Sequence, residues 1–199
     1  MADTPPLDKT DEELVRFTLK DRENYRHLMQ KYEDKLTRYI IRLTGVSSED
    51  AEDILQGVFI KAYRNLNSFN PNLKFSSWIY RIAHNEAVTY LRRADTRPKT
   101  INPEASSILV GLIKSNLDIE EAIDKKKMEE KLKETIQKLD QKYRDVLILK
   151  YIEGKDYREI SDILRKPQGT VATLLKRAKE QLREEILKQK TLRKLFFWR

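Results

Sequence analysis

The sequence predicts an all-α protein made of two small helical domains joined by a flexible linker, the C-terminal domain being a helix-turn-helix. Apolar residues recur at spacings of three and four almost throughout the 199 residues, which is the period of an amphipathic helix. Runs of β-branched residues bounded by turn signals, which are typical of strands, are few. Hydrophobic residues make up 39% and charged residues 36% of the chain, so small cores can form while charged helix faces stay in water.

The N-terminal half predicts a first stretch of helices over 11–45, followed by helices over 47–66 and 76–93. The first stretch ends at Gly45, a residue suited to the left-handed conformation that often closes a helix. The second begins with a serine followed three residues later by an aspartate, which resembles a capping box. A polar stretch at 67–74 that contains a proline separates the second helix from the third.

The apolar pattern is weakest at 97–117, where two prolines, adjacent serines and a glycine occur. We therefore expect a linker over 96–124 between domains at 11–95 and 125–190, followed by a basic and aromatic tail at 191–199.

The C-terminal domain predicts two helices around a tight break at 165–168. Asp156, with Glu159 three residues later, can cap the first of them. This short helix is expected to bury Tyr157, Ile160, Ile163 and Leu164. In the second helix a narrow arc must face the core, namely Val171, Leu175, Ala178 and Leu182.

The opposite side of that second helix carries Thr173, Lys176, Arg177 and Glu180. A basic and hydroxylic face suits a helix that enters the major groove of DNA. An ordinary helical hairpin with a charged outer face fits the same pattern, because this geometry recurs in proteins that bind no DNA.

Positive charge is concentrated in the same half of the chain. Residues 125–199 contain 22 basic and 12 acidic side chains, a net charge of +10, whereas the whole chain carries +8. Each lysine or arginine set against a phosphate releases a counterion, so this asymmetry favours a polyanion as partner. A basic, solvated helix surface explains the charge equally well.

The predicted helix at 47–66 has two distinct faces. The inward face is formed by Ala51, Ile54, Leu55, Val58 and Ala62. The outward face is formed by Asp53, Gln56, Gly57, Ile60, Tyr63 and Arg64. Apolar anchors rimmed by polar groups are how protein contact surfaces are built, although single exposed apolar residues are also common where nothing binds.

The polar stretch and the helix after it predict a second surface. Phe69, Phe75 and Trp78 are interleaved with Asn, Ser and Lys, a composition that can stack on unpaired bases and neutralise phosphate. The alternative is that the aromatic rings cap the domain core, and we expect at least one to do so. The helix itself is expected to bury Ile79, Ile82, Ala83 and Tyr90, with Arg81, Asn85 and Arg92 on its far side.

Several classes of chemistry are excluded by composition. The chain has no Cys and only two His, so it offers no disulfide, no thiolate zinc site and no ordinary metal centre, and we expect no cofactor. No run of about 18 apolar residues occurs, so we expect a cytoplasmic protein without stable membrane insertion. A nuclease that uses Asp50 and Asp53 is remote, because carboxylates at a helix N-terminus need no catalytic explanation.

Two long motifs resemble the extracytoplasmic-function (ECF) family of bacterial sigma factors. The first consists of DAEDILQGVFIKAY at 50–63 and FSSWIYRIAHN at 75–85, and the second includes YREIS at 157–161 and PQGTV at 167–171. The resemblance extends from about Asp11 to Leu187. It implies a non-enzymatic promoter-specificity subunit that binds core RNA polymerase, recognises promoter DNA and helps to melt it.

The resemblance also implies three sets of site residues. The set that docks on polymerase is Asp50, Asp53, Gln56, Gly57, Phe59, Ile60 and Tyr63. The set that reads the melted minus-ten element is Asn67, Ser68, Phe69, Asn70, Lys74, Phe75, Trp78, Arg81, Asn85, Arg92 and Arg93. The set that reads the minus-thirty-five element is Gln168, Gly169, Thr170, Ala172, Thr173, Lys176, Arg177 and Lys179.

The partners implied are bacterial core RNA polymerase, promoter DNA and an anti-sigma factor, with no small-molecule substrate. Two residues depart from the family pattern: Gly57 stands where the family usually has Glu or Asp, and Ala172 stands where a basic residue is frequent. The competing hypothesis is an autonomous helix-turn-helix regulator that binds duplex operators as a dimer. Such a regulator needs neither the outward face at 53–63 nor the aromatic stretch.

Overall fold

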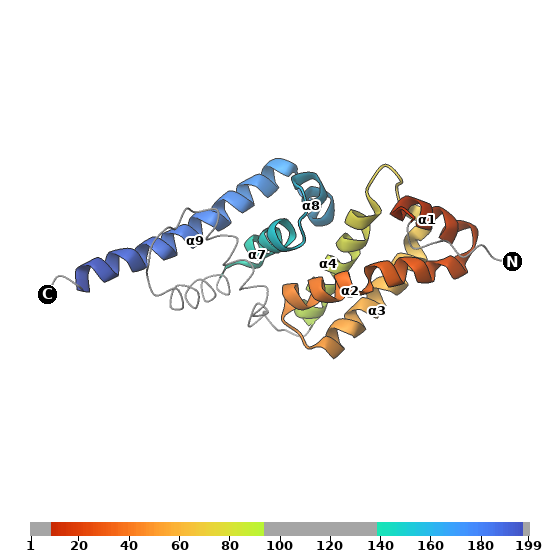
Figure 1. Ribbon diagram of the computed structural model, residues 1–199, viewed down its shortest axis with the longest axis horizontal. Coiled ribbons are helices and arrows are strands. Elements are labelled where there is room, and N and C mark those ends of the chain that lie inside the picture. Colours follow the sequence, from red (N-terminus) through yellow and green to blue (C-terminus); the bar gives the residue numbers. More distant parts are fainter. Residues whose placement is uncertain (1–8, 94–138, 197–199) are drawn as a thin grey trace. The chain divides into compact units, whose positions relative to one another are not determined.

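The computed structural model describes residues 9–93 and 139–196, and every regular element in these two ranges is helical (Figure 1). Contacts divide the chain into two compact units, the first containing α1 to α4 and the second containing α7 and α9. The prediction of an all-α protein is confirmed. The predicted linker at 96–124 lies outside the described residues.

The N-terminal unit contains α1 (Asp11–Lys20), α2 (Tyr25–Thr44), α3 (Ser48–Asn65) and α4 (Phe75–Arg93). The helices predicted over 11–45 are α1 and α2, which are separated where Asp21 adopts an extended conformation and caps a 3₁₀ turn at Arg22–Asn24. A second 3₁₀ turn, Leu66–Ser68, follows α3.

Both caps predicted from the sequence of this unit are present. Gly45 closes α2 with a φ of +72°, in the left-handed region. At the start of α3, the Ser47 hydroxyl accepts a hydrogen bond of 3.1 Å from the Asp50 amide.

The core of this unit lies where α2, α3 and α4 pack together. The predicted inward face of α3 is confirmed, since all five of its members are buried. In α4, Ile79 and Ala83 are buried as predicted, but Ile82 and Tyr90 are only half-buried. Helix α4 packs against both α2 and α3. Its buried residues include a row at a spacing of four together with three more near its N-terminus: Phe75, Ile79, Ala83, Ala87 and Leu91, with Ser77, Trp78 and Tyr80.

Helix α1 is fastened to α2 by its first turn. Thr10 and Glu13 form a capping box at its N-terminus. The Lys31 ammonium lies 2.8 Å from Asp11 Oδ1, and the Tyr32 hydroxyl donates a hydrogen bond to the same carboxylate. One aspartate thus joins the two helices.

The C-terminal unit contains α7 (Gln141–Leu147), which continues into a π-helical turn at Ile148–Ile152, and α9 (Gln168–Phe196). Between them lies α8 (Tyr157–Leu164), so α8 and α9 form the predicted helix-turn-helix. The single residue with positive φ in the break is Arg165, at +52°. Helix α9 runs through most of the predicted tail.

The predicted cap of α8 is confirmed, because the Glu159 amide donates to Asp156 Oδ1 at 2.7 Å and the Asp156 amide donates to Glu159 Oε2 at 3.1 Å. The predicted buried arc of α9 is also confirmed, each member being at most 2% exposed. Of the four residues predicted to be buried in α8, two are buried. Ile160 and Ile163 are buried, but Tyr157 is 41% exposed and Leu164 half-buried, since the helix is only 8 residues long and buries a narrow arc.

Gly57 is a position at which stability can be raised. It lies inside α3, and a Cβ added there would meet the Glu86 carboxylate at 3.7 Å, an ordinary contact. Because glycine is about 1 kcal/mol less favourable than alanine within a helix, Gly57→Ala is expected to stabilise the unit by about 1 kcal/mol. Urea unfolding followed by circular dichroism measures this.

Gly154 provides the contrast, because it closes its helix at a φ of +65°. Gly154→Ala is expected to destabilise the protein by about 1 kcal/mol. A loss of stability in Gly57→Ala would contradict the open surroundings of that glycine.

Candidate polymerase and promoter interfaces

The outward face of α3 has exposed apolar residues at its centre and polar residues around them. Ile60 is 52% exposed and Tyr63 39% exposed, and both lie on the side opposite the buried residues of the helix. Asp53 and Gln56 are exposed about two turns and one turn before Ile60, and Gly57 is half-exposed. This face has the anatomy of a protein contact surface.

Three residues of the predicted docking set have partners inside the unit: Phe59, Asp50 and Tyr63, whose ring lies 5.2 Å from that of Tyr25. Phe59 is only 8% exposed and packs edge-on against Tyr25, whose hydroxyl donates to the Phe59 carbonyl at 2.8 Å. The Asp50 carboxylate lies 2.8 Å from the Ser47 hydroxyl. The pKa of Tyr90 is raised by desolvation and by a hydrogen bond with Asp50. These contacts hold α3 in place, and direct docking by Asp50 and Phe59 stays a prediction.

A carboxylate that the sequence does not single out lies beside the docking face. Glu86 on α4 forms an ion pair with Lys61 on α3, and its other oxygen is the atom nearest to the position of a Gly57 Cβ. Glu86 thus places negative charge next to the residue at which the family usually carries an acid. Lys61 and Glu86 are 25 residues apart in the sequence, so no local pattern predicts their contact.

The three aromatic residues predicted to meet DNA form a closed cluster. Phe69, Phe75 and Trp78 are 9%, 1% and 6% exposed, with ring centroids 5.5 to 5.6 Å apart. The expectation that at least one caps the core is confirmed for all three. The exposed members of the predicted set in this segment are instead polar: Asn67, Ser68, Asn70 and Lys74. The exposed polar side chains at 67–74 form a polar rim over this buried cluster of aromatic rings.

The stripe predicted on α4 lies at the surface. Asn85, Arg92 and Arg93 are exposed and Arg81 is half-buried. Next to Asn85, the His84 ring nitrogen Nδ1 lies 3.0 Å from the hydroxyl of Tyr39, whose ring in turn packs against Tyr80. Buried aromatic residues therefore support the helix behind the stripe.

All eight residues predicted to read the minus-thirty-five element are exposed at the start of α9. Thr173 donates its hydroxyl proton to the Gly169 carbonyl at 2.8 Å, so toward any partner its oxygen can act only as an acceptor. Lys176 lies 3.8 Å from Glu180, a distance typical of a loose surface pair. Arg177 and Lys179 are exposed beside it.

A buried ionisable pair lies in α7, beneath this helix. Gln141 donates a hydrogen bond of 3.3 Å to Asp145, and both Arg144 and Asp145 are 7% exposed. Burial raises the pKa of Asp145 to about 7, against the lowering effects of Gln141, Arg144 and Lys166. No sequence pattern predicts this pair, because its burial depends on the packing of α7 against α9.

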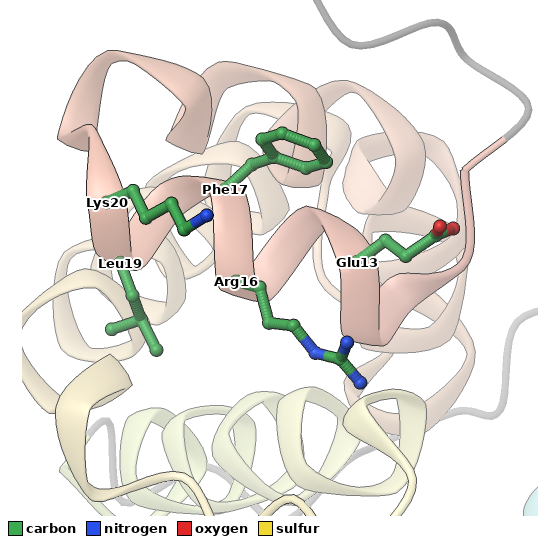
Figure 2. Close-up of a pocket in the computed structure, with 5 residues that line it drawn as sticks. All are labelled: Glu13, Arg16, Phe17, Leu19 and Lys20. Atoms are coloured by element: carbon green, nitrogen blue, oxygen red, sulfur yellow. The ribbon is translucent and has the colours of Figure 1, made fainter.

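A shallow hollow is lined by side chains of α1, shown in Figure 2: Glu13, Arg16, Phe17, Leu19 and Lys20. Arg16 and Leu19 point to one side of the helix and Phe17 to the other. These lining residues include no serine, threonine or histidine. Within 9–93 and 139–182, no three His, Asp or Glu side chains converge as they would around a metal ion.

None of the described helices combines the length and the apolar character that crossing a bilayer requires.

Comparison with known proteins assigns both units. The model of sigma-70 region 2 matches residues 28–97, and that of sigma-70 region 4 matches residues 129–182. The ECF RNA polymerase sigma factor SigW of Bacillus subtilis is 33% identical over 170 residues, covering 83% of this chain and 90% of SigW. The ECF RNA polymerase sigma-E factor of Haemophilus influenzae is 32% identical over 182 residues, covering 89% and 95%.

Solved structures share the fold. CnrH in complex with the cytosolic domain of CnrY superposes with a TM-score of 0.62 at 21% identity, over 88% of this chain and 96% of that one. The sigma factor RpoE in complex with the anti-sigma factor NepR from Bartonella quintana gives 0.55 at 19% identity, over 83% and 98%. Since sequence relatives align along most of their length and both conserved regions fall on the two helical units, the chain belongs to the ECF family and is a sigma factor that directs RNA polymerase to promoters.

Proposed function

We propose that the two units divide promoter recognition between them. The N-terminal unit, taken as 11–95, docks on the clamp coiled coil of core RNA polymerase through the outward face of α3. It captures the unpaired minus-ten strand with the polar rim at 67–74 and the α4 stripe. The C-terminal unit, taken as 125–190, places the start of α9 in the major groove of the minus-thirty-five element.

The observation that carries this division is the contrast between the two polar surfaces. In the N-terminal unit, amide and hydroxyl groups are presented over a buried aromatic floor, beside the exposed apolar centre of α3. In the C-terminal unit, cations and a hydroxyl line one exposed helix. A dimeric regulator of duplex operators would need only the second surface, so that alternative is not favoured.

We further propose that the chain acts in the cytoplasm without a cofactor or chemistry of its own, and that an anti-sigma factor holds it inactive. The similar RpoE structure was solved with the anti-sigma factor NepR. An antagonist that covers α3 and the start of α9 would block both partners. The decisive experiment is transcription with purified core polymerase on genomic templates, in which absence of any new promoter-dependent transcript would refute the proposal.

The two reading surfaces should respond differently to substitution. Arg177→Ala is expected to weaken binding of duplex minus-thirty-five DNA about tenfold, because one phosphate or base contact is lost. The slope of the logarithm of the binding constant against the logarithm of the salt concentration should become shallower by about one. Asn85→Ala should leave duplex binding intact and slow promoter opening. Filter binding across salt concentrations and permanganate reactivity of the minus-ten bases measure the two effects. Normal opening by Asn85→Ala would contradict the assignment of the α4 stripe.

A further inference from the structure

An arginine outside the motifs joins the docking face to the minus-ten loop. Arg22 lies in the turn between α1 and α2, and its Nη2 donates a hydrogen bond of 2.9 Å to Asn67 Oδ1. Its Nη1 donates to the Tyr63 carbonyl at 3.3 Å, and the guanidinium carbon lies 5.0 Å from the centre of the Tyr63 ring. One side chain therefore contacts the end of α3 and the first loop residue predicted to meet DNA.

The turn that carries Arg22 is itself fixed on both sides. Asp21 accepts a hydrogen bond of 3.0 Å from the Glu23 amide, which closes the turn. Tyr25, directly after the turn, packs its ring 5.2 Å from that of Tyr63. Since the backbone before and after Arg22 is held in this way, its guanidinium is presented to Asn67 from a defined position.

The chemistry of this contact orients the Asn67 amide. A guanidinium has only donors, so the atom of Asn67 that meets it must be the carbonyl oxygen. The Asn67 NH₂ group, with its two donors, is then directed away from Arg22. Because Asn67 is exposed, these donors are available to an acceptor on a partner.

We propose that Arg22 is a positioning residue for promoter melting, which holds Asn67 with its NH₂ group toward an acceptor atom of the unpaired minus-ten strand. This role rests on the proposed function of the loop. The sigma-70 region 2 match begins at residue 28, so Arg22 lies outside the matched region. Its contact with Tyr63 places the same arginine at the edge of the docking face.

The test uses full-length protein assembled with core polymerase and a single-stranded oligonucleotide carrying the non-template minus-ten segment of a promoter mapped by transcript 5′-end sequencing. Arg22→Ala and Asn67→Ala are each expected to weaken oligonucleotide binding about fivefold, the scale of a partly exposed hydrogen bond to a charged group. The double variant is expected to bind no more weakly than either single variant, because both remove the same oriented amide.

Two further variants separate positioning from charge and from folding. Arg26→Ala removes an equal charge from the next turn of the chain, where the guanidinium contacts only the neighbouring His27 among the described residues, and it should change binding less than twofold. Arg22→Lys keeps the charge but lacks the planar fork, so an intermediate loss is expected. Urea unfolding of each variant reports its stability, and Arg22→Lys decides the question if Arg22→Ala does not fold.

The outcomes distinguish this inference from the function on which it rests. If Asn67→Ala weakens binding and Arg22→Ala does not, Arg22 has no positioning role while the loop assignment stands. If the two losses multiply in the double variant, Arg22 acts on DNA independently and the inference is overturned. If Asn67→Ala has no effect, the loop assignment at Asn67 fails and the role of Arg22 fails with it.

Discussion

Ile60→Asp is expected to weaken binding to core RNA polymerase about 100-fold or more. Ile60 is 52% exposed at the centre of the docking face, so it has few contacts to lose within the folded protein. In a complex, however, an apolar residue at the centre of an interface is where binding energy concentrates, and an unpaired carboxylate buried there adds a desolvation penalty. Competition with labelled wild-type protein for a limiting amount of core enzyme measures the loss.

Leu19→Asp is the matched control for this experiment. Leu19 is 44% exposed on α1 and belongs to no predicted interface, so the same change in polarity should alter core binding less than twofold. Both variants should unfold at nearly the wild-type urea concentration, because surface substitutions of this kind shift stability by about 0.5 kcal/mol or less. Unchanged competition by Ile60→Asp would show that polymerase binds another face of the unit.

Phe75→Ala is expected to cause the largest loss of stability, about 3 to 5 kcal/mol in the N-terminal unit. Phe75 is 1% exposed, and the rings of Tyr32, Phe69 and Trp78 lie within 5.6 Å of its own. Removing the ring leaves a cavity beneath the polar rim. Urea unfolding followed by circular dichroism measures the loss, and Phe75→Leu, which keeps part of the apolar volume, should lose less than half as much.

The same variant separates the two units functionally. With its minus-ten surface destabilised, Phe75→Ala should fail in promoter opening at 37 °C while the full chain still binds duplex minus-thirty-five DNA through α9. A variant of wild-type stability that nevertheless fails to open promoters would contradict a purely supporting role for Phe75 and would restore direct base stacking by its ring.

Features of the fold that depend on neighbouring residues were predictable. The caps at Ser47 and Asp156 and the buried arc of α9 follow from residues three or four positions apart, which a sequence displays directly. The break at Asp21 and the π-helical turn at Ile148–Ile152 were not predicted. Part of the buried arc of α4 was misplaced, because α4 packs against both α2 and α3 and its own sequence does not show which side each of them covers.

The candidate interface residues likewise divide into those that a local pattern predicts and those that depend on contacts distant in the sequence. Exposure of Gln56, Ile60 and Tyr63 followed from the helical period, as did the exposed cations of α9. The contact between Arg22 and Asn67 spans 45 residues and could not be read from any local pattern. Aromatic composition alone likewise could not distinguish a ring that stacks on a base from one that supports the loop.

The closed aromatic cluster under the loop has a thermodynamic consequence for strand capture. Its rings already occupy fixed places in the free protein, so they lose no rotational freedom when DNA arrives. Most of the conformational entropy lost on association is then lost by the nucleic acid, which must adapt to a binding surface that is already formed. Selection among sequences would therefore favour segments whose strands separate and bend at low cost.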